Sequence, residues 1–180
     1  MPRPRCSVFI ATSLDGFIAR RDGGIDWLSM VETPGEDYGY AKFFGDVGAL
    51  LLGRGTYDTV LGFPSWPYGD KPCVVFTHRP PAEARNRERF YAGAPAPLLE
   101  ELHASGVRRV YVDGGALIRL FLRENLIDDL TLSIIPVILG DGIPLFGEGL
   151  KECRLRLAGS QAFASGLVQL RYESGTNLNG

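Results

Sequence analysis

The chain has 180 residues, of which 45% are hydrophobic and 22% charged, a composition with which one domain can bury its own core. Its net charge of −2 leaves no cationic excess for nucleic acid, and no uncharged stretch is long enough to span a bilayer. The N-terminus lacks a secretory apolar segment. We therefore expect a cytoplasmic protein with one domain over residues 1–180, a frayed tail at residues 174–180, and neither nucleic acid nor a membrane as its partner.

Cysteine and histidine usage excludes two further classes. The three cysteines, Cys6, Cys73 and Cys153, lie far apart and form no CxxC pair, which argues against a disulfide framework or a zinc cage. Two histidines are too few for a multi-histidine metal centre. No metal is therefore expected to take part in the chemistry.

The first half of the chain is predicted to alternate strands with helices. Residues 5–11 read as an apolar strand that runs into turn residues at 12–16, which we expect to form a mobile loop. Helical spacing of apolar residues around residues 38–44 precedes a wholly apolar run at residues 49–52. A run that is apolar throughout is typical of a strand buried on both faces of a parallel sheet.

The alternation continues with predicted strands at residues 73–77 and 107–112 and predicted helices at residues 97–104 and 116–124. The last of these helices is apolar on one face, which suits docking against a sheet. Strands that alternate with helices predict an α/β three-layer sandwich with a mostly parallel central sheet.

The C-terminal part has a different pattern. A long strand is predicted at residues 130–139, with a bulge or edge position at Pro136 because proline cannot donate a ladder hydrogen bond. Residues 155–163 and 167–172 flank Ala164-Ser165-Gly166, a pattern typical of a β-hairpin. The sandwich is therefore expected to end in a C-terminal antiparallel hairpin.

The passage from the strand at residues 49–52 into the next helix is a candidate anion site. It contains Gly53, Arg54 and Thr56, and we expect Thr56 to open the helix. Free N–H groups, the helix dipole, a hydroxyl and a guanidinium together suit a phosphate or pyrophosphate. The alternative is that Thr56 is an ordinary N-cap and Arg54 a solvated charge.

Two further strand ends carry residues suited to a nucleotide. Gly114-Gly115 lets the backbone approach a ligand closely, although a tight turn would use the same pair. Thr77-His78-Arg79 follows a strand, where Arg79 beside Thr77 could hold a 2′-phosphate or be a solvated loop residue. No G-x-G-x-x-G occurs, so a Rossmann dinucleotide site is not predicted.

Several carboxylates are candidates for proton transfer. They are Asp15, Asp26, Glu36, Asp37 and Asp113. A carboxylate at a helix start such as Asp37 is explained by capping alone, yet at the edge of a pocket it could relay a proton to a ring nitrogen. Both roles stay open.

Five stretches occur together in one order along the chain. They are residues 9–19, 26–28, 52–57, 112–115 and 135–146, of which the last follows the pattern P-x-x-L-G-x-G-x-P-L-F. This ordered set resembles the dihydrofolate-reductase-like family of the riboflavin-biosynthesis reductase C-terminal domain. The resemblance covers nearly the whole chain and implies a dihydrofolate-reductase-like fold, NADPH as cofactor and a homodimer.

The resemblance also implies roles for particular residues. Arg54 and Thr56 would meet the NADPH pyrophosphate, and Thr77 with Arg79 would face the 2′-phosphate. Asp37 and Asp15 are the candidate catalytic residues, and the loop around Asp15 would close over the nicotinamide. The full set expected to bind the cofactor is Ala11, Leu14, Gly16, Gly53, Arg54, Thr56, Thr77, His78, Arg79, Asp113, Gly114, Gly115 and Ala116.

The resulting hypothesis is an NADPH-dependent reductase that transfers hydride to a small heterocyclic or carbonyl substrate. The best-defined candidate is 5-amino-6-(5-phosphoribosylamino)uracil of riboflavin biosynthesis. The alternatives are a dihydrofolate or pterin reductase-like enzyme and a non-catalytic nucleotide-binding sensor module.

Overall fold

The computed structural model describes residues 2–175. Its central sheet consists of β1 (Arg5–Ser13), β3 (Ala49–Gly53), β4 (Cys73–Phe76), β5 (Arg89–Tyr91), β6 (Arg109–Asp113), β7 (Asp129–Ile135), β9 (Leu155–Ala162) and β10 (Val168–Ser174). The remaining elements are β2 (Phe17–Ala19), β8 (Ile143–Pro144), the 3-10 helix η1 (Asp26–Val31), α1 (Tyr40–Gly45), α2 (Arg54–Leu61), α3 (Pro95–Ala104) and α4 (Gly115–Arg123). No helix in the described part of the chain is long and apolar enough to cross a membrane.

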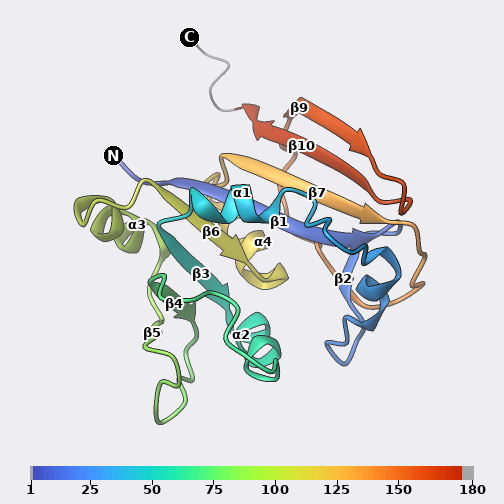
Figure 1. Cartoon of the computed structure of the whole chain (residues 1–180). Coiled ribbons are helices and arrows are strands. Elements are labelled where there is room, and N and C mark those ends of the chain that lie inside the picture. Colours follow the sequence, from blue (N-terminus) through green and yellow to red (C-terminus); the bar gives the residue numbers. More distant parts are fainter. Residues whose placement is uncertain (1, 176–180) are drawn as a thin grey trace.

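The strands of the central sheet lie in the order β5-β4-β3-β6-β1-β7-β10-β9 (Figure 1). All pairings from β5 to β7 are parallel, whereas β10 is antiparallel to both β7 and β9. A separate two-stranded antiparallel sheet joins β2 to β8. The predicted mostly parallel sheet and C-terminal hairpin are therefore confirmed.

Strict alternation along β3 creates the two faces of the sheet. Leu51 packs with the apolar sides of α3 and α4, whereas Leu50 and Leu52 pack with Tyr57 of α2 and the aromatic side of α1. Each of these three leucines is fully buried. Because consecutive side chains of a strand point to opposite faces, one apolar run serves both helical layers. The three-layer sandwich is confirmed.

The boundaries of several elements differ from the sequence prediction. β7 ends at Ile135, so Pro136 lies beyond the strand and not in a bulge within it. The N–H of Val137 returns to the Ile135 carbonyl at 2.7 Å, which turns the chain away from the sheet. The helix α3 begins two residues earlier than predicted, with Pro95 at its first turn, where a missing N–H costs nothing.

Two residues near helix starts and one at the tail also require correction. Thr56 does not open α2, since the N-cap is Gly53 and no side chain caps the helix. Tyr38 has a φ of 56° and precedes α1, which begins at Tyr40. Ser174 was expected in the frayed tail but ends β10, while residues 176–180 lie outside the described part of the chain.

Candidate functional site

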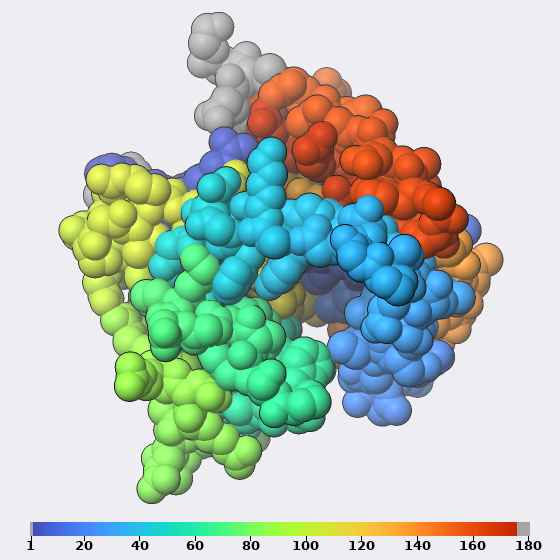
Figure 2. Space-filling view, in the orientation of Figure 1, coloured from blue at the N-terminus to red at the C-terminus, as the bar shows by residue number. Residues whose placement is uncertain are grey.

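Two cavities adjoin at the carboxyl end of β1. The first, which we name the glycine-lined cavity, has a volume of about 830 Å³ and lies against the ends of β1, β3 and β6. The second, the aromatic cavity, has a volume of about 770 Å³ and lies between β1, β7 and residues 31–40. They share walls made by Phe9, Ile10, Ala11 and Leu28. Figure 2 shows the hollow between the blue N-terminal segment and the green α2.

Two helices begin at the glycine-lined cavity. The first residues of α2 and α4 line it, and their N-caps are Gly53 and Gly114. Neither helix receives a side-chain cap, so the N–H groups of both first turns are available to a ligand. Two such helix starts on one cavity, with the positive ends of both dipoles, favour an anion with more than one phosphate.

Gly114 holds these two helix starts close together. Its φ of 108° is rarely adopted by residues with a Cβ, and a Cβ there would lie 2.7 Å from the Thr56 Oγ1 and 3.3 Å from the backbone of Gly53. β3 and β6 are paired neighbours, which brings their carboxyl ends side by side. Glycine at this position therefore permits the approach of α4 to α2.

Arg54 connects the first turn of α2 to the segment after β4. Its guanidinium pairs with Asp58 at 2.8 Å and also donates to the carbonyl oxygen of Arg79. The Thr77 hydroxyl accepts the backbone N–H of Arg79 at 3.1 Å. Thr77, His78 and Arg79 do not line either cavity but lie next to the α2 start, because β4 pairs with β3 up to Phe76 beside Gly53.

Asp113 is the half-buried carboxyl group of the glycine-lined cavity. Burial raises its pKa to about 6, against the opposing hydrogen bonds from the Gly114 N–H and the Tyr111 hydroxyl. Tyr111 and Tyr68 line the same cavity, and burial raises the pKa of each phenol. The result is a carboxyl group that takes up and releases a proton near neutral pH within a wall of neutral phenols.

The aromatic cavity combines rings with carboxylates. Phe9 and Tyr40 are in edge contact at 5.5 Å between ring centroids, and Ser133 contributes a buried hydroxyl from β7. Asp37 accepts the N–H groups of Ala41 at 2.8 Å and Gly39 at 2.9 Å. These hydrogen bonds lower the pKa of Asp37, which is therefore ionised at neutral pH and suited to accept hydrogen bonds from a ligand.

The turn after β1 is held by the chain that follows Pro136. Asp15 accepts the Ser13 hydroxyl at 2.6 Å and the N–H groups of Leu139 at 3.1 Å and Gly140 at 2.7 Å. The Leu14 N–H donates to the Val137 carbonyl at 2.7 Å. The turn expected to be mobile is thus tied to a second loop, and neither Asp15, Leu14 nor Gly16 lines the two cavities.

The structure therefore brings together part of the predicted set. Those that line the glycine-lined cavity are Ala11, Gly53, Arg54, Thr56, Asp113, Gly114, Gly115 and Ala116. Asp37 lines the aromatic cavity, which Ala11 also borders. Sequence reasoning did not single out Ile18, Tyr68 or Arg119. No local pattern marks these three, since apolar, aromatic and basic residues at those positions also suit a core or a solvated helix face.

Comparison with known proteins places this arrangement in a family. The RibD C-terminal domain matches residues 4–169. The uncharacterized protein YwjB of Bacillus subtilis (strain 168) is 41% identical over 167 residues, which are 92% of this chain and 95% of YwjB. A crystal structure of a Shewanella sp. PV-4 protein assigned to riboflavin biosynthesis has a TM-score of 0.87 at 36% identity, over 94% of this chain and 98% of that chain.

The same fold occurs in a larger protein of Thermotoga maritima, named diaminohydroxyphosphoribosylaminopyrimidine deaminase/5-amino-6-(5-phosphoribosylamino)uracil reductase. Its TM-score is 0.73 at 18% identity, over 96% of this chain and 57% of that chain. The sequence match over residues 4–169 and the shared fold agree with each other. This chain belongs to the RibD C-terminal domain family.

Proposed function

We propose that this protein is an NADPH-dependent reductase that acts on a small heterocyclic or carbonyl substrate. The observation that carries the proposal is the convergence of two uncapped helix starts on the glycine-lined cavity, which shares the wall around Ala11 with the aromatic cavity. NADPH supplies a hydride, and thus two electrons, to a substrate carbon. The protein's own contribution is to bind, orient and shield the reacting groups.

The glycine-lined cavity has the donor set that a dinucleotide needs. The N–H groups at the starts of α2 and α4, together with the Arg54 guanidinium, would bind the pyrophosphate. The nicotinamide would then lie against Ala11 of β1, next to the aromatic cavity. Thr77 and Arg79 beside the α2 start would bind the 2′-phosphate, which sets NADPH apart from NADH.

Reduction of a C=N or C=O bond also consumes one proton at the nitrogen or oxygen. Asp113, with a pKa of about 6, is protonated in a useful fraction of molecules near neutral pH and would hold this proton. Asp37, whose pKa is lowered, would instead orient the substrate by accepting a hydrogen bond. The two carboxyl groups would therefore have different roles, set by their surroundings.

The cofactor assignment is tested by fluorescence titration with NADPH and with NADH. We expect tighter binding of NADPH, because its extra phosphate gains charge-assisted hydrogen bonds, and we expect Arg79→Ala to narrow the difference. Arg85→Ala, a change of another exposed arginine in the same loop, is the matched control and should leave the difference unchanged. Equal affinity of the wild-type protein for both cofactors would remove the basis of the assignment.

Two substrates are the first to assay for consumption of NADPH. One is 5-amino-6-(5-phosphoribosylamino)uracil, which the name of the Thermotoga maritima protein contains. The other is a dihydropterin, favoured by the aromatic rings and the Asp37 carboxylate of the aromatic cavity. Tight cofactor binding without oxidation across a wide metabolite panel would instead support a nucleotide-binding sensor.

A further inference from the structure

The charged side chains of the aromatic cavity are all acidic among the described residues. Its charged lining residues are Glu32, Glu36 and Asp37, and among the described residues no Lys, Arg or His lines it. Resting on the reductase function proposed above, we propose that the substrate is a nitrogen heterocycle that carries no phosphate and is neutral or positively charged.

The three carboxylates are not neutralised by partners on the protein. Within residues 2–175, none of them forms an ion pair. Glu36 accepts the N–H of Tyr38 at 2.7 Å, and Asp37 accepts those of Gly39 and Ala41. These bonds hold the negative groups at the cavity without adding positive charge. A phosphate in the cavity would be repelled by all three and would lack a cationic donor.

The neighbouring cavity differs because positive groups also line it. Arg21, Arg54 and Arg119 line the glycine-lined cavity with Asp22, Asp58 and Asp113, and the starts of α2 and α4 add free N–H groups. Because Arg21 and Arg54 are paired with carboxylates, the two helix starts are the groups that most favour the phosphates of a dinucleotide there. In the aromatic cavity, the charged lining groups among the described residues are carboxylates alone. This difference separates a phosphate-bearing cofactor from a phosphate-free substrate on the two sides of Ala11.

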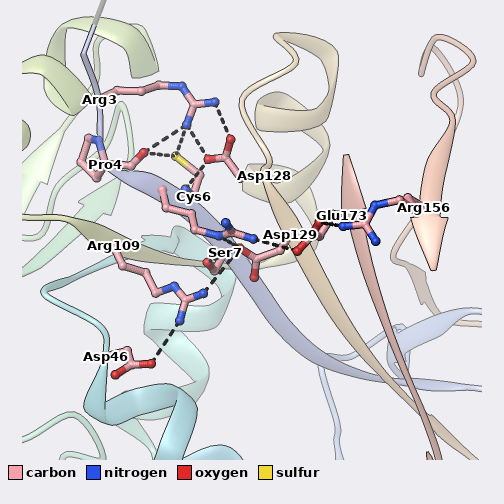
Figure 3. Close-up of polar contacts among 11 residues, drawn as sticks. Arg3, Pro4, Cys6, Ser7, Asp46, Arg109, Asp128, Asp129, Arg156 and Glu173 are labelled. Atoms are coloured by element: carbon pink, nitrogen blue, oxygen red, sulfur yellow. Dashed lines mark hydrogen bonds and ion pairs between the residues drawn. The ribbon is translucent and has the colours of Figure 1, made fainter. Parts of the chain in front are cut away.

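A charged groove of about 420 Å³ adjoins the aromatic cavity at Phe9 and Tyr38 and could in principle receive a phosphate tail. Its arginines are mostly committed to the protein. Arg109 pairs with Asp46 at 3.4 Å and Asp129 at 3.7 Å, as Figure 3 shows. Asp129 also pairs with Arg5, which lies 3.5 Å from Glu173.

Two cations of this groove remain for a ligand. Lys42 and Arg171 are exposed, and neither forms an ion pair within the described residues. Three acidic residues line the same groove, so its four cations leave little net positive charge. The groove is therefore a poor phosphate site, and these two residues define the variant that tests it.

The aromatic cavity suits a heterocycle on positive grounds as well. Phe9, Tyr38 and Tyr40 surround it, and their rings can stack on a planar ligand or contact a cationic one. The carboxylates of Glu36 and Asp37 accept N–H groups, which pyrimidines and pterins carry on their ring edges. Ring contacts and acceptors together select the heterocycle, and the carboxylates select against phosphate.

The test compares two ligands that differ in one group: 5-amino-6-(5-phosphoribosylamino)uracil and the same compound without its phosphate. Calorimetry measures the binding of each, and of a dihydropterin, to the protein saturated with NADP⁺. We expect the phosphate-free compound to bind about tenfold more tightly than its phosphorylated form. Glu32→Gln with Glu36→Gln should narrow this ratio, and Glu148→Gln, an exposed change that lines neither cavity, should not.

Equal or tighter binding of the phosphorylated compound would overturn the proposal. If that preference were lost in Lys42→Gln with Arg171→Gln, the charged groove would be the phosphate site. Failure of every heterocycle to bind the NADP⁺-saturated protein would also overturn it. Failure of NADPH itself to bind would instead refute the proposed function, so the two failures are distinguishable, and neither readout depends on turnover.

Discussion

Replacing Gly114 by alanine tests the geometry of the two helix starts. Gly114 has a φ of 108°, where a residue with a Cβ is strained by about 1–3 kcal/mol. The new Cβ would also lie 2.7 Å from the Thr56 Oγ1 and 3.3 Å from the Gly53 backbone. The hydroxyl can rotate away, but the backbone cannot, so overpacking adds about 1–3 kcal/mol. We expect Gly114→Ala to lower the free energy of unfolding by about 2–6 kcal/mol.

The same substitution should weaken the binding of the cofactor, because α4 must move away from α2. A shift of a few tenths of an ångström misaligns N–H groups that would bind one pyrophosphate, and loss of one charged hydrogen bond is worth about 1.5–3 kcal/mol. NADPH affinity should therefore fall at least about tenfold. Urea unfolding measures the stability, and calorimetry below the unfolding temperature measures the affinity.

Gly106→Ala is the matched control. Gly106 has a φ of 95°, but no neighbouring atom lies within 4 Å of the position that a Cβ would take, and it lines neither cavity. This variant should carry the backbone strain without the displacement of α4, and should bind NADPH as the wild type does. If Gly114→Ala lost no more stability than Gly106→Ala and bound NADPH normally, the argument from helix proximity would be wrong.

Three further substitutions separate binding, turnover and titration. Arg54→Ala should weaken NADPH binding by about 1.5–3 kcal/mol, the scale of a charged hydrogen bond. Its melting temperature should barely move, because the ion pair with Asp58 that is lost is exposed. Unchanged NADPH affinity with a large loss of stability would make Arg54 a structural residue. Asp37→Asn keeps one acceptor oxygen of two, so we expect a small loss of stability and about tenfold lower kcat/KM, because an amide oxygen is a weaker acceptor than a carboxylate. Full activity would leave Asp37 as a cap. The raised pKa of Asp113 means that the folded protein keeps this proton up to about pH 6, whereas the unfolded chain loses it near pH 3.8. Protonated Asp113 therefore stabilises the fold most below pH 3.8, and this contribution falls as the pH rises from 3.8 to about 6 and is level above that. Urea unfolding of Asp113→Asn at several pH values should lack this fall. A plot of stability against pH identical to that of the wild type would contradict the prediction.

Much of the fold follows from short-range patterns. The apolar run of β3 and the one-sided helix α4 are properties of consecutive residues, so their type was predictable from periods of 2 and 3.6. Element ends were less predictable. The start of α2 depends on which N–H groups are capped. Threonine is a common capping residue, but Thr56 does not occupy the N-cap position of α2, which is Gly53.

The candidate site was predictable where it depends on strand ends. Gly53 follows an apolar run directly, Gly114 follows another with Asp113 between, and glycines at such strand ends are candidates for anion binding from the sequence alone. That both belong to one cavity depends on the pairing of β3 with β6, which no local pattern specifies. Sheet order is decided by contacts between segments far apart in the chain.

The surroundings of the carboxylates were decided by tertiary structure alone. Asp15 and Asp37 are both exposed aspartates near turns, and residue type does not separate them. Asp15 is bound by the N–H groups of the loop after β7, whereas Asp37 lines the aromatic cavity. A carboxylate interacts with the charges and donors that the fold places within a few ångströms, and many of these come from segments far away in the sequence. Strand and helix patterns depend instead on residues that are close together in the sequence.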